Sequence, residues 1–274
     1  MGDNPVTSVT TIKEGMSTWR CELCGADRFL SVAPMIVRCP HCSLVVTYPV
    51  PDDKELESRY GGDYYHGWDG RGSRSRLWDS RLRIIRSFVR SGRILDVGCG
   101  TGEFLKVAQG AGFEVTGTEF SPVARALVRT CAVYTNPAEV PGEWDAVTLW
   151  HVLEHTRSPR ELLLSIRRRM KPQAFVFIAV PNLESRWFNL VYRCVKGRWP
   201  QLYSLDAKEP HLFHFSPRTL SMLLESSGFA PVCMTPDVPD THFRYRIIDL
   251  PARVLFQCSK INWCLTLLVA ATKK

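Results

Sequence analysis

The sequence has no long hydrophobic run among its 274 residues. Its longest candidate, residues 261–271, has about half of the roughly 20 apolar residues that span a bilayer, so we expect no transmembrane segment. Residues 1–18 are polar and contain no apolar stretch ahead of a cleavage site, so we also expect no signal peptide. Internal repeats and low-complexity tracts are missing too. These absences favour an ordinary globular protein.

Cysteine, by contrast, is plentiful, and four of the ten cysteines form two Cys-x-x-Cys pairs separated by fourteen residues: Cys21, Cys24, Cys39 and Cys42. Four thiolates can close a tetrahedral site and leave no open position, so the pairs predict structural zinc. Gly25 favours a knuckle turn after the second cysteine, and His41 is expected to be an exposed neighbour. A redox pair and free buried thiols are the alternatives. Metal-binding cysteines indicate a reducing compartment, and we expect a cytoplasmic location.

The formal net charge is +8, much of it from arginines within residues 71–93 and 167–171. A basic surface can bind phosphates, nucleic acid or an anionic membrane. However, the arginines around residues 76–91 alternate with apolar residues in a helical pattern, which is equally typical of a solvated helix face. Charge alone does not choose between these interpretations.

The chain divides into four regions: a flexible lead (1–18), a zinc ribbon (19–50), a linker with a leading helix (51–92), and a large domain (93–274). In the large domain, apolar runs alternate with helical stretches, which predicts a parallel sheet covered on both faces. Ser121, Ser158 and Ser216, each followed by proline, predict helix starts. Residues 182–215 interrupt the alternation and are rich in aromatics, so we expect a lid insertion there. The expected strands are 93–97, 113–118, 132–134, 145–149, 174–180, 231–235 and 265–271; the expected helices are 76–91, 103–110, 122–130, 159–170 and 217–227.

The strongest local signal is an apolar strand that runs through Asp96 into a turn with glycines at 98, 100 and 102, and then into a helix. Glycine allows positive φ and a close approach of the backbone to a ligand, and the helix N-terminus suits an anionic group. Glu119 ends the next strand, where a carboxylate can accept ribose hydroxyls. A dinucleotide site would have its third glycine one residue later.

Asp-Val-Gly-Cys-Gly-Thr-Gly at 96–102, Glu119, Trp-Asp-Ala-Val at 144–147 and His-Val-Leu-Glu-His at 151–155 together resemble the small-molecule branch of the class I S-adenosylmethionine methyltransferases, over roughly residues 60–274. The resemblance implies a doubly wound α/β fold with a seven-stranded sheet in the order 3-2-1-4-5-7-6, strand seven (265–271) being antiparallel. It also implies cofactor contacts by Gly98, Gly100 and Gly102 (methionine part), Glu119 (ribose), Phe120 (adenine) and His151 (near the sulfonium), with Asp96 facing a cationic ligand.

The cysteine pairs, Tyr64 and Tyr65 further resemble methyltransferases of sugar, polysaccharide and natural-product pathways. We therefore expect an enzyme that methylates an oxygen or a carbon of a small biosynthetic acceptor by in-line transfer. Most of the catalysis would come from the proximity and alignment of the two reactants. A general base would come from His151, His155, His211 or His214. Alternatively, His151, Glu154, His155 and a later histidine could hold a divalent ion; some methyltransferases place Glu-x-x-Glu-His on a metal here, but this chain has His151 for the first glutamate.

Two other functions are possible on the sequence. The zinc ribbon and basic surface would suit an RNA methyltransferase, although the fourth strand ends in Leu149-Trp150-His151 and not in the Asn/Asp-Pro-Pro-aromatic turn of exocyclic-amine methylation. A non-enzymatic zinc-ribbon adaptor would not need the intact glycine turn and Glu119. The sequence leaves open the acceptor, the atom methylated and the oligomeric state.

Overall fold

The computed structural model describes residues 19–52, 55–56, 75–201, 210–237 and 243–274. The expected lead at 1–18, the Tyr64–Tyr65 pair and Tyr203 of the lid lie outside these ranges. Among the described residues, no helix has both the length and the apolar character needed to cross a bilayer.

A seven-stranded sheet forms the centre of the molecule, in the order β10-β11-β8-β7-β4-β5-β6. Five neighbouring strands are parallel, whereas β11 runs antiparallel to both β8 and β10. This confirms the predicted order, with the antiparallel strand in the predicted place. The strands are β4 (Arg93–Val97), β5 (Glu114–Thr118), β6 (Val133–Tyr134), β7 (Trp144–Trp150), β8 (Met170–Pro181), β10 (Phe229–Pro236) and β11 (Thr266–Lys273).

Two clusters of buried side chains cover the two faces of this sheet. Alternate residues of β8 point to opposite faces, so that Ile178 packs with side chains of α6 and α8, and Phe177 with those of α3 and α4. Because both faces are covered, the central strands are apolar along most of their length. The helices are α3 (Ser75–Phe88), α4 (Glu103–Gly110), α5 (Pro122–Leu127), α6 (Pro159–Arg168), α7 (Arg186–Lys196), α8 (Pro217–Ser226) and α9 (Phe243–Ser259).

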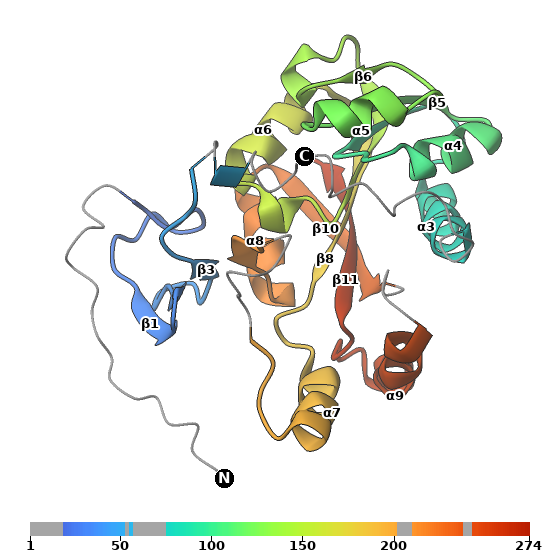
Figure 1. Ribbon diagram of the computed structural model, residues 1–274. Helices are drawn as coiled ribbons and strands as arrows, with labels where there is room; N and C mark the ends of the chain where they lie inside the picture. The colour runs from blue at the N-terminus through green and yellow to red at the C-terminus, as the bar shows by residue number, and fades with distance from the viewer. Residues whose placement is uncertain (1–18, 53–54, 57–74, 202–209, 238–242) are drawn as a thin grey trace.

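Three helices begin at the predicted serine–proline steps, with different cap chemistry. Ser121 accepts a hydrogen bond from the Ala124 N–H, and Ser216 forms a reciprocal capping box with Thr219. Ser158 occupies the N-cap position of α6 but makes no side-chain capping bond. Helix α9 was not expected, because Pro251 interrupts its sequence pattern. It contacts α7 at the lower end of the molecule (Figure 1).

The cysteine region forms a second, antiparallel sheet of β1 (Leu30–Ala33), β2 (Ile36–Arg38) and β3 (Val45–Thr47). Its fourth strand, β9 (Phe213–His214), comes from the expected lid and pairs with β3. Ribbon side chains such as Phe29 and Leu44 are fully buried in the same cluster as Leu212 and Phe215. The ribbon therefore packs on the large domain and shares its core; Figure 1 shows it beside α8.

Candidate functional site

The glycine turn joins β4 to α4. Gly98 has φ +69°, and a Cβ there would lie 2.5 Å from Cγ2 of Val152, so both the backbone and the packing require glycine. Gly100 has φ +53°, and a Cβ there would meet no atom of the described residues within 4 Å. Gly102, also at positive φ, is the N-cap of α4. The turn thus presents backbone and a helix N-terminus to a space that a ligand can fill.

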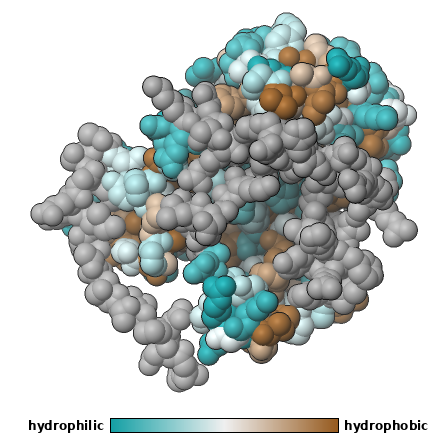
Figure 2. Space-filling model, viewed as in Figure 1, coloured by the Kyte–Doolittle hydropathy of each residue, from teal (hydrophilic) through white to brown (hydrophobic). Residues whose placement is uncertain are grey.

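Glu119 links this turn to the loop that follows β5. Its Oε2 accepts the Gly100 N–H at 2.9 Å and its Oε1 accepts the Ser121 N–H at 2.9 Å. The neighbouring Phe120 side chain is 51% exposed. Figure 2 shows hydrophobic residues gathered over α5, directly after this loop. A carboxylate, an exposed ring and an open glycine turn therefore meet at one edge of the sheet, which fits a nucleoside with an amino-acid tail.

Asp96 lies beneath the turn and is 1% exposed. Burial raises the pKa of its carboxyl to about 7, against the hydrogen bond from Thr148 and the positive charge of Arg81. Thr148 Oγ1 donates that hydrogen bond to Asp96 Oδ1 at 2.6 Å. Near neutral pH, Asp96 is thus divided between its neutral and charged forms, and a cationic group placed beside it would favour the charged form.

Arg81 of α3 is buried behind the site, although the sequence pattern assigned it to a solvated or basic surface. Its Nη2 lies 2.6 Å from Asp237 Oδ2, and its guanidinium carbon lies 5.0 and 4.6 Å from the ring centres of Trp78 and Trp150. Helical spacing in the sequence could have indicated that Arg81 is buried, because it falls four residues after buried Leu77. No local sequence pattern marks Asp237, which follows β10, as the partner of Arg81, so the sequence did not predict this ion pair.

Glu154 is the centre of a histidine cluster at the end of β7. His151 has φ +58°, a costly value for a residue other than glycine, and its Nδ1 lies 3.1 Å from Glu154 Oε1. Glu154 is 1% exposed, and its Oε2 has no hydrogen-bond partner among the described residues. Burial alone would raise the pKa of Glu154, but the bond with His151 and the charges of His151, His155 and His211 lower it.

The later histidines come from the end of the segment 182–215, which the sequence led us to expect as a lid. His211 lies against His155, with 4.9 Å between ring centres, and His214 lies 6.2 Å beyond His211. Burial lowers the pKa of His211 to about 4 and that of His214 to about 3, so both rings are neutral near pH 7. Ligand atoms of Glu154, His155 and His211 lie within 4.8 Å of one another and could hold a metal ion. The structure thus assembles three of the four histidines around Glu154 and places His214 next to the ribbon.

The four predicted cysteines form one cluster. Their Sγ atoms lie within 4.8 Å of one another, with Cys21–Cys42 at 3.4 Å and Cys24–Cys39 at 3.5 Å. All four are free thiols. Zn–S bonds of about 2.3 Å in a tetrahedron place sulfurs roughly 3.8 Å apart, so the cluster fits one tetrahedral ion.

Two matching turns carry these cysteines. Gly25 follows Cys24 at φ +71°, and Ser43 follows Cys42 at φ +68°. The Gly25 N–H donates to the Cys21 carbonyl, and the Ser43 N–H to the Cys39 carbonyl. His41 is exposed, as expected. The ribbon therefore presents its thiols from two equivalent knuckles.

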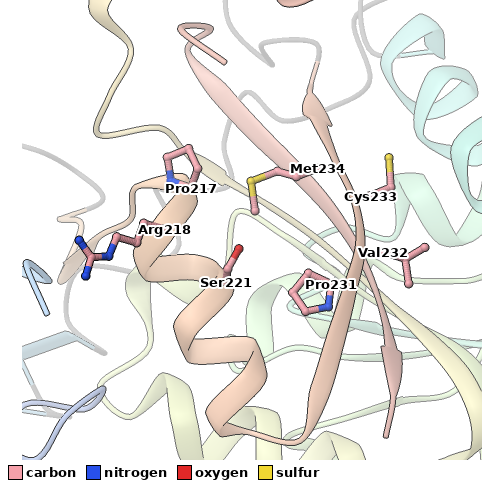
Figure 3. A pocket seen from close by; sticks show the side chains of 7 residues that line it. All are labelled: Pro217, Arg218, Ser221, Pro231, Val232, Cys233 and Met234. Atoms are coloured by element: carbon pink, nitrogen blue, oxygen red, sulfur yellow. The ribbon is translucent and has the colours of Figure 1, made fainter. Parts of the chain in front are cut away.

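A groove of about 430 Å³ lies between α8 and β10 (Figure 3). Among the described residues, its lining includes none from the glycine turn or the histidine cluster, and Arg218 is the one charged side chain. It lies on the edge strand, away from the chemistry described above. Its lining is Pro217, Arg218, Ser221, Pro231, Val232, Cys233 and Met234.

Comparison with known proteins gives one family match and several partial relatives. Residues 71–234 match a family model described as a methyltransferase domain. The chain is 29% identical over 126 residues to a ubiquinone biosynthesis O-methyltransferase of Thiobacillus denitrificans, covering 40% of this chain and 54% of that protein. It is 31% identical over 149 residues to the protein of the same name from Dechloromonas aromatica, covering 48% and 64%. The chain thus spans between half and two thirds of the length of these relatives.

Solved structures share the fold at lower sequence identity. The 1,6-didemethyltoxoflavin-N1-methyltransferase of Burkholderia thailandensis, with bound 1,6-didemethyltoxoflavin and S-adenosylhomocysteine, superposes with a TM-score of 0.56 at 17% identity. The match covers 86% of this chain and 98% of that one. At this identity the likeness concerns the fold alone.

The raised pKa of Asp96 predicts a pH-dependent effect of Asp96→Asn on stability. The folded parent retains the Asp96 proton up to about pH 7, whereas the unfolded chain releases it near pH 3.8. The parent should therefore lose stability relative to the variant as pH rises across this window, by on the order of 2–4 kcal/mol. Urea unfolding from pH 4 to 8 measures the difference.

Asp145→Asn is the matched control, whose stability difference from the parent should stay constant from pH 4 to 8. Burial tends to raise the pKa of Asp145, but the bond from Lys171 and its other partners lower it, so its contribution is present above about pH 4 and is lost in acid. A stability difference for Asp96→Asn that does not change with pH would contradict the assignment.

Proposed function

Because the chain belongs to the methyltransferase domain family, we propose that it transfers a methyl group from S-adenosylmethionine to a small biosynthetic acceptor. Membership of the family confirms the resemblance drawn from the sequence. The observation that carries the proposal is Glu119, whose carboxylate joins the glycine turn to the loop after β5 by accepting the N–H groups of Gly100 and Ser121. When bound, the cofactor supplies a methyl group on a sulfonium.

The residues of this chain would then bind the cofactor and align it with the acceptor. The backbone at Gly98, Gly100 and Gly102 wraps the methionine part, and Glu119 accepts the ribose hydroxyls. Phe120 flanks the adenine, Asp96 faces the cationic end and His151 lies near the sulfonium. Most of the rate enhancement of such a transfer comes from holding acceptor and methyl group in line. A neutral imidazole of the cluster accepts the acceptor's proton where that acceptor is a hydroxyl or an acidic carbon.

The packing of the ribbon favours a small molecule over RNA as the methyl acceptor. Its hydrophobic side chains are buried in the core that it shares with the large domain, and its β3 edge is paired with β9. These contacts give the ribbon a structural role that needs no nucleic acid. The curated relatives are named for ubiquinone biosynthesis, which is small-molecule chemistry. Sugars, glycan precursors and natural products remain the classes to test.

Glu119→Ala tests the cofactor site. Loss of the carboxylate removes charge-assisted hydrogen bonds to ribose, so binding of S-adenosylmethionine should weaken by on the order of 2–4 kcal/mol in calorimetry. Glu114→Ala, at the exposed start of the same strand, should bind like the parent. Unchanged affinity in Glu119→Ala, or binding of NAD in place of S-adenosylmethionine, would refute the site.

His155→Ala and His214→Ala test the chemistry once nucleotide sugars, phenolic precursors and small RNAs have been screened for methyl uptake. Each should lower turnover by ~100-fold or more and leave cofactor affinity nearly intact, as expected for loss of a general base or of its support. His41→Ala, on the exposed side of the ribbon, is the control. Parent rates in both variants would mean that alignment alone carries the reaction. Loss of activity in a chelator, restored by a divalent ion, would instead assign Glu154, His155 and His211 to a metal.

The four-cysteine cluster leads us to propose one structural zinc held by Cys21, Cys24, Cys39 and Cys42. Elemental analysis should find one equivalent, which is lost in Cys39→Ser together with the thermal stability of the ribbon, while cofactor binding is retained. Cys258→Ser, at an exposed cysteine outside the cluster, should keep the metal. A well-folded parent protein without metal would contradict this proposal.

A further inference from the structure

The ribbon holds the segment that carries His211 and His214. Strand β3 pairs antiparallel with β9, with Val45 opposite His214 and Val46 opposite Phe213. At the end of β3, the Thr47 N–H donates to the Leu212 carbonyl at 2.9 Å. These backbone bonds fix the register of the histidine segment against the ribbon.

Thr47 adds two contacts through its side chain, which is fully buried. Its Oγ1 lies 2.7 Å from the His211 carbonyl oxygen and 3.2 Å from Nε2 of His214. A carbonyl only accepts, so the single hydroxyl proton goes to His211. The contact with His214 then requires His214 to donate its Nε2–H to the hydroxyl. One hydroxyl thus fixes the backbone at His211 and the tautomer of His214.

The other side of the segment is held by the turn after β7. The Leu212 N–H donates to the Glu154 carbonyl at 2.7 Å. Nδ1 of His155 lies 3.0 Å from the Pro210 carbonyl, which makes Nδ1 the protonated nitrogen of that ring. Residues 210–214 are therefore clamped between the ribbon and the Glu154 turn, and the clamp sets the 4.9 Å separation of the His155 and His211 rings.

We propose that Thr47 is a positioning residue, through which the ribbon places His211 and His214 at the acceptor end of the site. The proposal rests on the proposed methyl transfer for its effect on turnover, but not for its effect on the two histidines. It gives the cysteine ribbon a part in the reaction, because the ribbon sets the geometry of the imidazoles at the acceptor end of the site.

Thr47→Val is the test, because valine keeps the shape of threonine and removes the hydroxyl. We expect turnover to fall by about 10–100-fold with little change in the Kd for S-adenosylhomocysteine, as for a small misplacement of reacting groups. Thr47→Ser, which restores the hydroxyl, should recover most of the rate. Val37→Ala is the matched control: Val37 is buried in the ribbon on the face of the sheet opposite Thr47, so the change weakens the ribbon core without removing a hydrogen bond to the histidine segment.

Histidine ring resonances of ¹⁵N-labelled protein, assigned with single His→Gln variants, provide a readout that does not need turnover. Thr47→Val should shift the Nε2 resonance of His214 and the ring signals of His211, whereas Val37→Ala should leave both in place. Unchanged signals in Thr47→Val overturn the proposal, as do shifted signals with a parent turnover rate. If the parent protein methylates no acceptor, the proposed function fails, while the ring signals still decide whether Thr47 positions the two histidines.

Discussion

Three carboxyl groups are withdrawn from water near the carboxyl ends of the parallel strands: Asp96 near the end of β4, Glu119 after β5 and Glu154 after β7. Charge taken out of water must be neutralised or hydrogen-bonded, and each group meets this requirement differently. Asp96 keeps its proton up to about pH 7, Glu119 accepts backbone N–H groups, and Glu154 is surrounded by imidazoles. The glycine turn, Thr148 and the histidine cluster supply the partners that Glu119, Asp96 and Glu154 need. The carboxyl groups at this edge of the sheet therefore differ in charge: Asp96 is partly protonated near neutral pH, whereas Glu154 is a buried anion.

The parts that the sequence predicted well are those with local signals. The strands themselves follow from alternating apolar runs, whereas their order in the sheet came with the family resemblance. The strand–glycine turn–helix unit lies within a few residues of Asp96. The antiparallel position of β11 came with the family resemblance and could not have been deduced from periodicity. The binding roles of Gly98, Glu119 and Phe120 stay predictions, although the Glu119 carboxylate is bonded to the glycine turn through the Gly100 N–H.

The parts that the sequence did not predict depend on contacts between distant segments. Arg81 and Asp237 meet across 156 positions, so each looked like an ordinary charged residue. Thr47 meets the histidine segment across 164 positions, and a single buried threonine in a cysteine ribbon carries no local sign of such a partner. The histidines themselves were easy to find, but their division into three around Glu154 and one against the ribbon required the register of β3 and β9.

The same register has a consequence for biosynthesis. The ribbon is made early, whereas the strand that completes its sheet is more than 160 positions later in the chain. At about 5–20 residues per second, β3 waits roughly 10–30 s on the ribosome with an unpaired edge. An open edge invites pairing with other chains, and short strands and nearby prolines reduce that hazard. Strand β3 has three residues and is followed within two positions by Pro49. Its shortness therefore protects a nascent chain as much as it shapes the finished fold.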